Sequence, residues 1–234
     1  MGKPKAFFFD IFGTVVDWRE GVAREARQVL HPLGHDMVWT AFADAWRGQY
    51  QAGMEEIRSG RQPFAKLDVV HARNLERILG QFGLSDISDD TKRALVLAWH
   101  KLDAWPDSSR GIAMLRKHGL VAPVSNGNVS LMAALARRNN FHWDAVLGAE
   151  FSRDYKPKPD VYLSACAAFD LAPEDCMMVA AHSDDLAAAK ACGLQTGFVA
   201  RPDEKGPGKG ESKPKIAVDV AGDDMVDLAQ KLFG

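Results

Sequence analysis

Six polar residues could together supply the charged groups of a reaction site. They are Asp10, Ser125, Asn126, Lys156, His182 and Asp185. Lys156 lies in the proline-rich loop 155–159, and the other five lie at or just beyond the ends of apolar segments. An ammonium group close to a carboxylate favours the ionised carboxylate. If the fold brings these residues to one edge, they form a charged, partly enclosed site in which Asp10 is ionised.

The elements that must position these residues follow from the pattern of apolar segments. After residue 106, short apolar runs and amphipathic segments of helix length alternate, which is typical of a parallel sheet with helices on both faces. We expect strands over 6–9, 120–124, 145–147, 177–180 and 196–199, and helices over 112–118, 131–139, 161–169, 186–192 and 224–233. Open parallel sheets bind ligands at the carboxyl ends of their strands. The residues at the strand ends are therefore expected to meet there.

Residues 18–104 differ from this alternation, because they show helical periodicity and no convincing strand. Val22, Ala26 and Val29, for example, fall on one helix face. We therefore predict an α/β protein with a Rossmann-like, doubly wound core domain (1–16 and 105–234) and an inserted all-helical cap domain (17–104). The Gly-, Lys- and Pro-rich segment 203–215 has no apolar positions, and we expect a solvated loop there.

The composition excludes several classes of protein. Of the 234 residues, 47% are hydrophobic and 26% are charged, a balance typical of soluble globular proteins. A net charge of -2 gives no basic surface for nucleic acid, and no apolar stretch approaches the about 20 residues of a membrane helix. The three cysteines form no CxxC pair, and no secretory signal precedes them. They predict buried, reduced thiols in a cytoplasmic protein.

The order of the polar residues resembles the four-motif pattern of the haloacid dehalogenase superfamily. The motifs are Asp10-x-x-Gly13-Thr14, Ser125-Asn126, Lys156-Pro157 and Asp185. They span nearly the whole chain in the family's order, and the helical insertion falls where the family has its cap. The resemblance implies that Asp10 is a nucleophile and that Thr14, Lys156 and Asp185 belong to the catalytic site.

Phe12, two residues after Asp10, separates this chain from the phosphatases of the superfamily. The phosphatases carry a second Asp there to protonate the leaving group, and an aromatic ring cannot donate that proton. They also hold Mg²⁺ partly through a Gly-Asp pair after the fourth strand, where this chain has Ala180-Ala181. Asp10 and Asp185 alone would supply too few carboxylate ligands for Mg²⁺. We therefore expect a reaction without a metal or another cofactor.

Within the superfamily, the chain resembles the 2-haloacid (haloacetate) dehalogenase group, which begins with Asp-x-aromatic-Gly-Thr. Trp46-Arg47-x-x-Tyr50 is similar to the group's Arg-bearing cap helix, and Tyr162 matches a tyrosine six residues after the lysine. The resemblance implies hydrolysis of a small 2-haloalkanoic acid to the 2-hydroxy acid, through an ester on Asp10. A halide needs no proton to leave, so an acid at position 12 would be redundant.

The resemblance also assigns residues to the substrate. Arg47 and Asn126 would donate hydrogen bonds to the departing halide, and Ser125 with nearby backbone N–H groups would hold the substrate carboxylate. The substrate-binding residues expected on this basis are Ile11, Phe12, Arg47, Ser125, Asn126, Tyr162 and Phe64, the last as a wall of the cap.

His182 stands where the chain departs from the group's pattern, which has Ser-Ser-Asn ahead of the final Asp. The residues at these positions are Ala180, Ala181 and His182. His182 could donate a hydrogen bond or act as the base in ester hydrolysis, with Lys156 and Asp185 positioning the water. The alternative is a spacer without a direct role.

Two other functions stay open at the level of the sequence. A phosphatase or phosphonatase with a relocated acid is the first, and Phe12 and Ala181 count against it. A catalytically silent member that binds a small anion or a partner protein is the second, and the complete set of motif residues counts against it. The resemblance further implies a homodimer that takes a haloacid and water, with no nucleic-acid or membrane partner.

Overall fold

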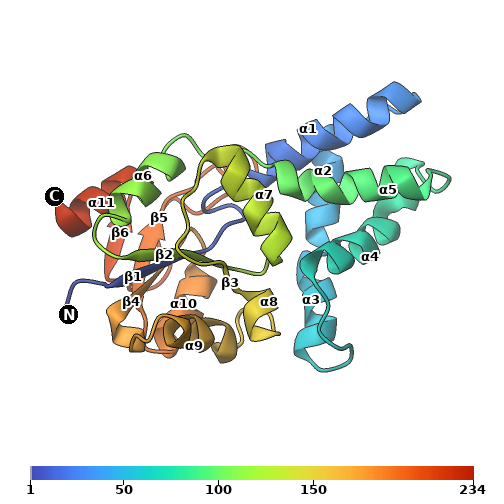
Figure 1. Ribbon diagram of the computed structural model, residues 1–234. Helices are drawn as coiled ribbons and strands as arrows, with labels where there is room; N and C mark the ends of the chain where they lie inside the picture. The colour runs from blue at the N-terminus through green and yellow to red at the C-terminus, as the bar shows by residue number, and fades with distance from the viewer. Residues whose placement is uncertain (1) are drawn as a thin grey trace.

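Six parallel strands form one sheet at the centre of the protein (Figure 1). The computed structural model describes residues 2–234, and the strands lie in the order β3-β2-β1-β4-β5-β6. Their bounds are β1 Ala6–Phe9, β2 Leu120–Ser125, β3 Leu147–Gly148, β4 Cys176–Ala180, β5 Gln195–Val199 and β6 Val220–Gly222. Phe8 of β1 lies opposite Ala122 of β2 and Met178 of β4. The predicted Rossmann-like parallel sheet is confirmed.

Helices cover both faces of the sheet, because alternate side chains of the central strand point to opposite faces. Phe7 and Phe9 pack into one core with α6, α7 and α11, whereas Phe8 packs into the other with α9 and α10. Figure 1 shows α6, α7 and α11 above the sheet and α9 and α10 below it. The bounds are α6 Ser108–Leu115, α7 Val129–Asn139, α9 Pro159–Ala168, α10 Ser183–Ala191 and α11 Met225–Phe233, with the shorter α8 Ala149–Ser152 and the 3-10 helix η4 Pro173–Asp175.

Residues 18–101, between β1 and β2, form a purely helical segment that we call the helical block. It lies on the side of the sheet remote from both chain ends (Figure 1). Its elements are α1 Trp18–Leu30, η1 His31–Leu33, α2 Trp39–Gly48, α3 Tyr50–Arg58, α4 Leu67–Leu79, η2 Gly80–Phe82, α5 Asp89–Val96 and η3 Leu97–Lys101. Trp46 and Trp99 are buried at its centre, with ring centroids 5.6 Å apart. Val16 and Ala104 form a β-bridge where the chain enters and leaves the block.

Several helices begin earlier than the sequence predicts. α6 begins at residue 108 rather than 112, α9 at 159 rather than 161, and α10 at 183 rather than 186. Their first turns carry serine, aspartate or proline, residues that suit the unpaired N–H groups of a helix start but interrupt the apolar periodicity. β3 is also shorter than expected and covers only residues 147–148.

The structure tests two expectations from the composition, namely that the cysteines are buried thiols and that no helix is long and apolar enough to span a membrane. Cys166 and Cys176 are buried free thiols, as predicted, whereas the free thiol of Cys192 is only half-buried. Of the helices in residues 2–234, none combines the length and the apolar character needed to cross a bilayer.

Candidate active site

A cavity of about 1130 Å³ lies at the carboxyl ends of the strands, where the sheet faces the helical block. Asp10 follows β1, Asn126 follows β2 and His182 follows β4, so three strands that are neighbours in the sheet deliver side chains to it. Of the residues singled out in the sequence, the cavity wall contains Asp10, Phe12, Arg47, Asn126, Lys156, Tyr162, His182 and Asp185. The expected convergence at the strand ends is therefore observed.

Both oxygens of the Asp10 carboxylate contact donors. Lys156 Nζ lies 3.2 Å from Oδ1, while Thr14 Oγ1 donates to Oδ2 at 2.8 Å and His182 Nδ1 lies 3.0 Å from the same oxygen. Burial by itself would raise the pKa of Asp10, but the Lys156 charge and the His182 hydrogen bond outweigh it and lower the pKa below its usual value. Asp10 is therefore ionised, as a carboxylate nucleophile must be.

Lys156 is buried and bridges two carboxylates. Its Nζ also donates to Asp185 Oδ2 at 2.6 Å, and the Tyr162 hydroxyl donates to Asp185 Oδ1 at 2.6 Å. Burial would lower the pKa of Lys156, but Asp10 and Asp185 outweigh it and raise the pKa, so the ammonium form is favoured. Tyr162 and Asp185 thus fix a positive charge beside Asp10.

His182 links Asp10 to a second buried carboxylate, Glu204. His182 Nε2 lies 3.1 Å from Glu204 Oε2, and the Trp18 indole N–H donates to Glu204 Oε1 at 2.9 Å. Burial would lower the pKa of His182, but its hydrogen bonds to Asp10 and Glu204 outweigh it and raise the pKa to about 10. With both carboxylates ionised, His182 is therefore an imidazolium at neutral pH.

Glu204 was missed at the level of the sequence, because it lies in the segment 203–215 for which a solvated loop is predicted. That prediction is wrong for Glu204, which is only 2% exposed. The loop folds back on itself through backbone hydrogen bonds from Arg201 to Glu211 and from Gly210 to Pro202. Gly13, with a φ of +89°, leaves room for the Glu204 carboxylate, since a Cβ there would collide with it. The pattern of apolar residues predicts neither the closure of this loop nor the close approach of Glu204 to Gly13.

Arg47, near the end of α2, lies among aromatic rings with one donor unused. Its guanidinium carbon is 3.8 Å from the Tyr50 ring centroid and 5.3 Å from that of Trp18. Its buried Nη1 has no hydrogen-bond partner within residues 2–234. Leaving a buried donor unsatisfied is unfavourable, so an electronegative ligand atom would be stabilised at this position.

Three residues expected to bind substrate lie outside the cavity wall. Ile11 and Ser125 are buried beneath it, and Ser125 Oγ accepts a hydrogen bond from the Gly127 N–H at 3.1 Å. Phe64 was expected as a wall of the site. It packs instead against Tyr155, with ring centroids 5.6 Å apart, because the Tyr155 hydroxyl donates to the neighbouring Ala65 carbonyl oxygen at 2.8 Å and holds the two segments together.

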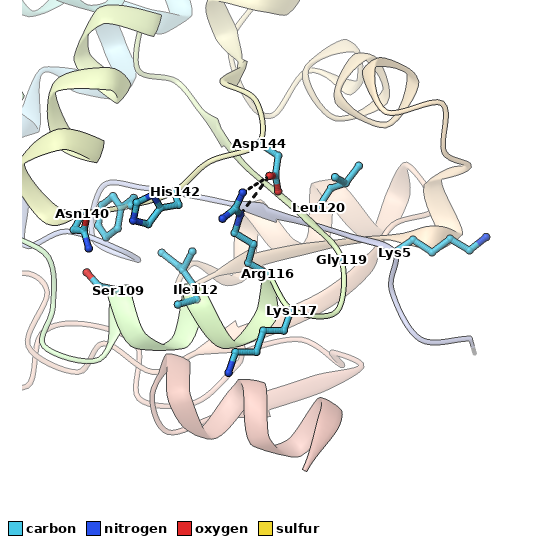
Figure 2. Close-up of a pocket in the computed structure, with 12 residues that line it drawn as sticks. Lys5, Ser109, Ile112, Arg116, Lys117, Gly119, Leu120, Asn140, His142 and Asp144 are labelled. Atoms are coloured by element: carbon cyan, nitrogen blue, oxygen red, sulfur yellow. Dashed lines mark hydrogen bonds and ion pairs between the residues drawn. The ribbon is translucent and has the colours of Figure 1, made fainter.

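A second cavity, of about 500 Å³, lies beside the amino-terminal ends of β1 and β2 (Figure 2). Arg116 in its wall donates to Asp144 at 2.8 Å, and Lys5 and Lys117 point outward. None of the candidate site residues lines it. The candidate chemistry therefore belongs to the larger cavity.

Residues 2–234 contain no cluster of side chains that could bind a metal ion. No group of three or more His, Cys, Asp or Glu side chains there has a suitable arrangement. In the larger cavity, Lys156 and His182 contact the Asp10 oxygens at which a Mg²⁺ ion would have to bind. The Asp10 oxygens are therefore arranged to bind these two cationic side chains rather than a metal ion.

The raised pKa of His182 predicts a pH-dependent stability. Its value of about 10 in the folded protein lies above that of an unfolded histidine, so the stabilisation is complete below about pH 6.5 and is lost as the pH rises toward 10. We expect the melting temperature to fall across this window, by several degrees. The change should be much smaller in His182→Asn, whereas the exposed His142→Asn should behave like the wild type. An equally steep fall in His182→Asn would show that other groups cause it.

Comparison with known proteins identifies one family from both sequence and structure. A family model described as haloacid dehalogenase-like hydrolase matches residues 4–193. Among curated proteins, (S)-2-haloacid dehalogenase 1 of Pseudomonas sp. (strain CBS-3) is 28% identical over 201 residues, which cover 84% of each chain.

Two solved structures of L-2-haloacid dehalogenases are similar to this chain over its whole length. A defluorinating enzyme gives a TM-score of 0.95 at 38% identity, covering 99% of this chain and 96% of the other. A second gives a TM-score of 0.93 at 38% identity, covering 99% of both chains.

Proposed function

The chain belongs to the haloacid dehalogenase-like hydrolases, and we propose that it hydrolyses small 2-haloalkanoic acids to 2-hydroxy acids through an ester on Asp10. The similar proteins named above as 2-haloacid dehalogenases support this reaction. The observation that carries the proposal is the Asp10 carboxylate held between Lys156 at 3.2 Å and His182 at 3.0 Å, in a cavity where Arg47 has an unused donor. Asp10 is placed to act as the nucleophile, Lys156 and His182 balance its charge, and Arg47 can donate a hydrogen bond to the departing halide.

In the first step, an Asp10 oxygen attacks the carbon that bears the halogen, and the halide leaves with the bonding electron pair. Oδ1 is the better nucleophile, because one donor contacts it and two donors contact Oδ2. Arg47 Nη1 and the Asn126 amide donate to the departing halide. Asn126 Oδ1 already accepts the Lys156 N–H at 2.9 Å, which leaves its NH₂ group as the donor.

In the second step, water attacks the Asp10 Cγ of the ester, with His182 as the base. Esterification removes the negative charge of Asp10, so the pKa of His182 falls and its proton is released. Neutral His182 then takes a proton from the attacking water, while Glu204 stabilises the imidazolium that forms. The Cγ–Oδ1 bond breaks, the product alkoxide takes the second water proton from the new Asp10 carboxyl group, and Asp10 is again a carboxylate beside imidazolium His182.

The alternative phosphatase activity lacks the carboxylic acid that the phosphatases carry two residues after the nucleophile. Phe12 occupies the position of the phosphatases' acid and is 2% exposed, packed edge-on against Trp99. The groups closest to Asp10 are cationic, and they suit a leaving group that departs as an anion without a proton. We therefore prefer the halide reaction.

Release of halide from EDTA-treated protein tests the proposed function. We expect chloride from chloroacetate and 2-chloropropionate at the same rate before and after EDTA treatment, because no step needs a metal. Fluoroacetate and the two enantiomers of 2-chloropropionate test which halide and which enantiomer react, since similar proteins are named a defluorinating L-2-haloacid dehalogenase and an (S)-2-haloacid dehalogenase. No halide from any of these acids, together with Mg²⁺-dependent release of phosphate from an ester, would overturn the proposal in favour of a phosphatase.

We also infer from the resemblance that residues 17–104 act as a cap over the substrate. The cavity wall supports this, because Arg47 and Tyr50 of the helical block line the same cavity as Asp10 and Lys156, which lie outside the block. The homodimer and the cytoplasmic location stay predictions from the resemblance and the composition.

A further inference from the structure

Arg58, the last residue of α3, reaches from the helical block to the backbone of Lys156. Its Nη1 donates to the Lys156 carbonyl oxygen at 2.7 Å. The Arg58 side chain is only 11% exposed and lines the cavity. A charge-assisted hydrogen bond of this kind is among the stronger polar contacts in proteins. It joins the helical block directly to the residue that holds the ammonium group beside Asp10.

The guanidinium of Arg58 is fixed by its own helix before it meets Lys156. Its Nε donates to Glu55 Oε2 at 2.9 Å, and Nη1 donates to Gln51 Oε1 at 3.2 Å. Gln51 and Glu55 lie two turns and one turn before Arg58 on α3, so all three side chains share one helix face. The guanidinium therefore has little freedom to lose when it binds the carbonyl.

Lys156 is consequently held at three points. Its N–H donates to Asn126 at 2.9 Å, on the sheet side of the cavity, and its carbonyl accepts from Arg58, on the side of the helical block. Its ammonium group then spans Asp10 and Asp185. Removing the contact from the helical block would free one side of the backbone on which the ammonium group depends.

We propose that Arg58 is a positioning residue, which fixes the Lys156 ammonium beside Asp10 only when the helical block lies against the sheet. This inference rests on the proposed function and adds a requirement to it. The opposite end of α3 carries Tyr50, next to Arg47 in the cavity wall. The helix α3 thus begins beside the halide donor Arg47 of α2 and orders the lysine at its end, so docking of this part of the helical block readies both residues together.

Arg58→Ala should lower kcat while changing KM little. Small displacements of a reacting group reduce rates by up to about a hundredfold, so we expect a loss of about ten- to a hundredfold in kcat. Arg93→Ala is the matched control, because Arg93 is an exposed arginine of the same block whose one ion pair within residues 2–234 is with Asp90. It should keep the wild-type kcat. Thermal unfolding of both variants verifies that they fold.

Two further measurements separate positioning from a merely structural role. Guanidinium ions added to Arg58→Ala should restore part of kcat, and Arg58→Lys should lie between Arg58→Ala and the wild type. The acid limb of kcat/KM should also move to higher pH in Arg58→Ala, because a displaced Lys156 no longer lowers the pKa of Asp10 as strongly. If Arg58→Ala is unstable, Arg58→Lys with its pH profile decides the question.

Two outcomes would overturn the inference. A wild-type kcat and pH profile in Arg58→Ala would show that Lys156 keeps its position unaided. A raised KM with unchanged kcat would show that Arg58 binds substrate directly. Both outcomes require an active wild-type enzyme, whereas failure of the proposed function would appear as absence of halide release from the wild type.

Discussion

Asp10→Asn is expected to lower halide release by at least about 10⁴-fold, because the amide is no longer an anionic nucleophile. The substitution keeps the size of the side chain, so the cavity should keep its shape. Steady-state halide release and intact-protein mass spectrometry provide the measurement. The variant should show neither turnover nor an alkylated protein.

Asp184→Asn is the control for this substitution. Asp184 lines the same cavity and lies next to Asp185, but among the described residues its carboxylate accepts a hydrogen bond only from the Asp185 N–H. We expect this variant to keep a rate close to that of the wild type. Substantial halide release by Asp10→Asn, with no Asp10 regenerated by deamidation, would exclude a covalent mechanism through Asp10.

His182→Asn is expected to trap the ester. Asparagine can still donate to Asp10, as His182 Nδ1 does, but it cannot reach Glu204 or carry a proton. General acid–base catalysis contributes about 10²- to 10⁴-fold, and we expect a loss of that size in steady-state turnover. The first step should persist, so one halide per enzyme should appear in a burst, with a covalently modified Asp10 in the mass spectrum.

Glu204→Gln tests the same pair from the other side. It removes one of the two carboxylate charges that raise the pKa of His182, so hydrolysis should slow, but by less than in His182→Asn. The exposed His142→Asn should turn over like the wild type. Loss of the burst together with turnover in His182→Asn would assign His182 to the attack on substrate, against its proposed role in hydrolysis.

The sequence was sufficient to predict the parts of the fold that apolar periodicity determines. The central strand at residues 6–9 and the polar residues after β1, β2 and β4 all lie where predicted. Asp10, Asn126 and His182 accordingly meet in one cavity. Parallel topology explains this success, because it brings the carboxyl ends of neighbouring strands to one edge whatever the details of packing.

Glu204 and Arg58 could not be predicted, since their positions depend on contacts between segments far apart in the chain. Glu204 is brought to His182 by a loop that closes on its own backbone and by the space above Gly13. Arg58 meets Lys156, 98 residues later, only through the docking of α3 over the sheet. Phe64 is the opposite case: it was predicted to line the site, but it packs against Tyr155, outside the cavity wall.

The wall of the larger cavity also determines how many anions it can hold at once. Six Asp or Glu and six Lys or Arg side chains line it, and protonated His182 adds one further positive charge. That excess matches a single haloacid anion. Hydrolysis, however, converts one anion into two, a halide and a hydroxy acid. The second anion exceeds the charge of the wall, so the products repel each other inside it and electrostatics favours emptying the site for the next turnover.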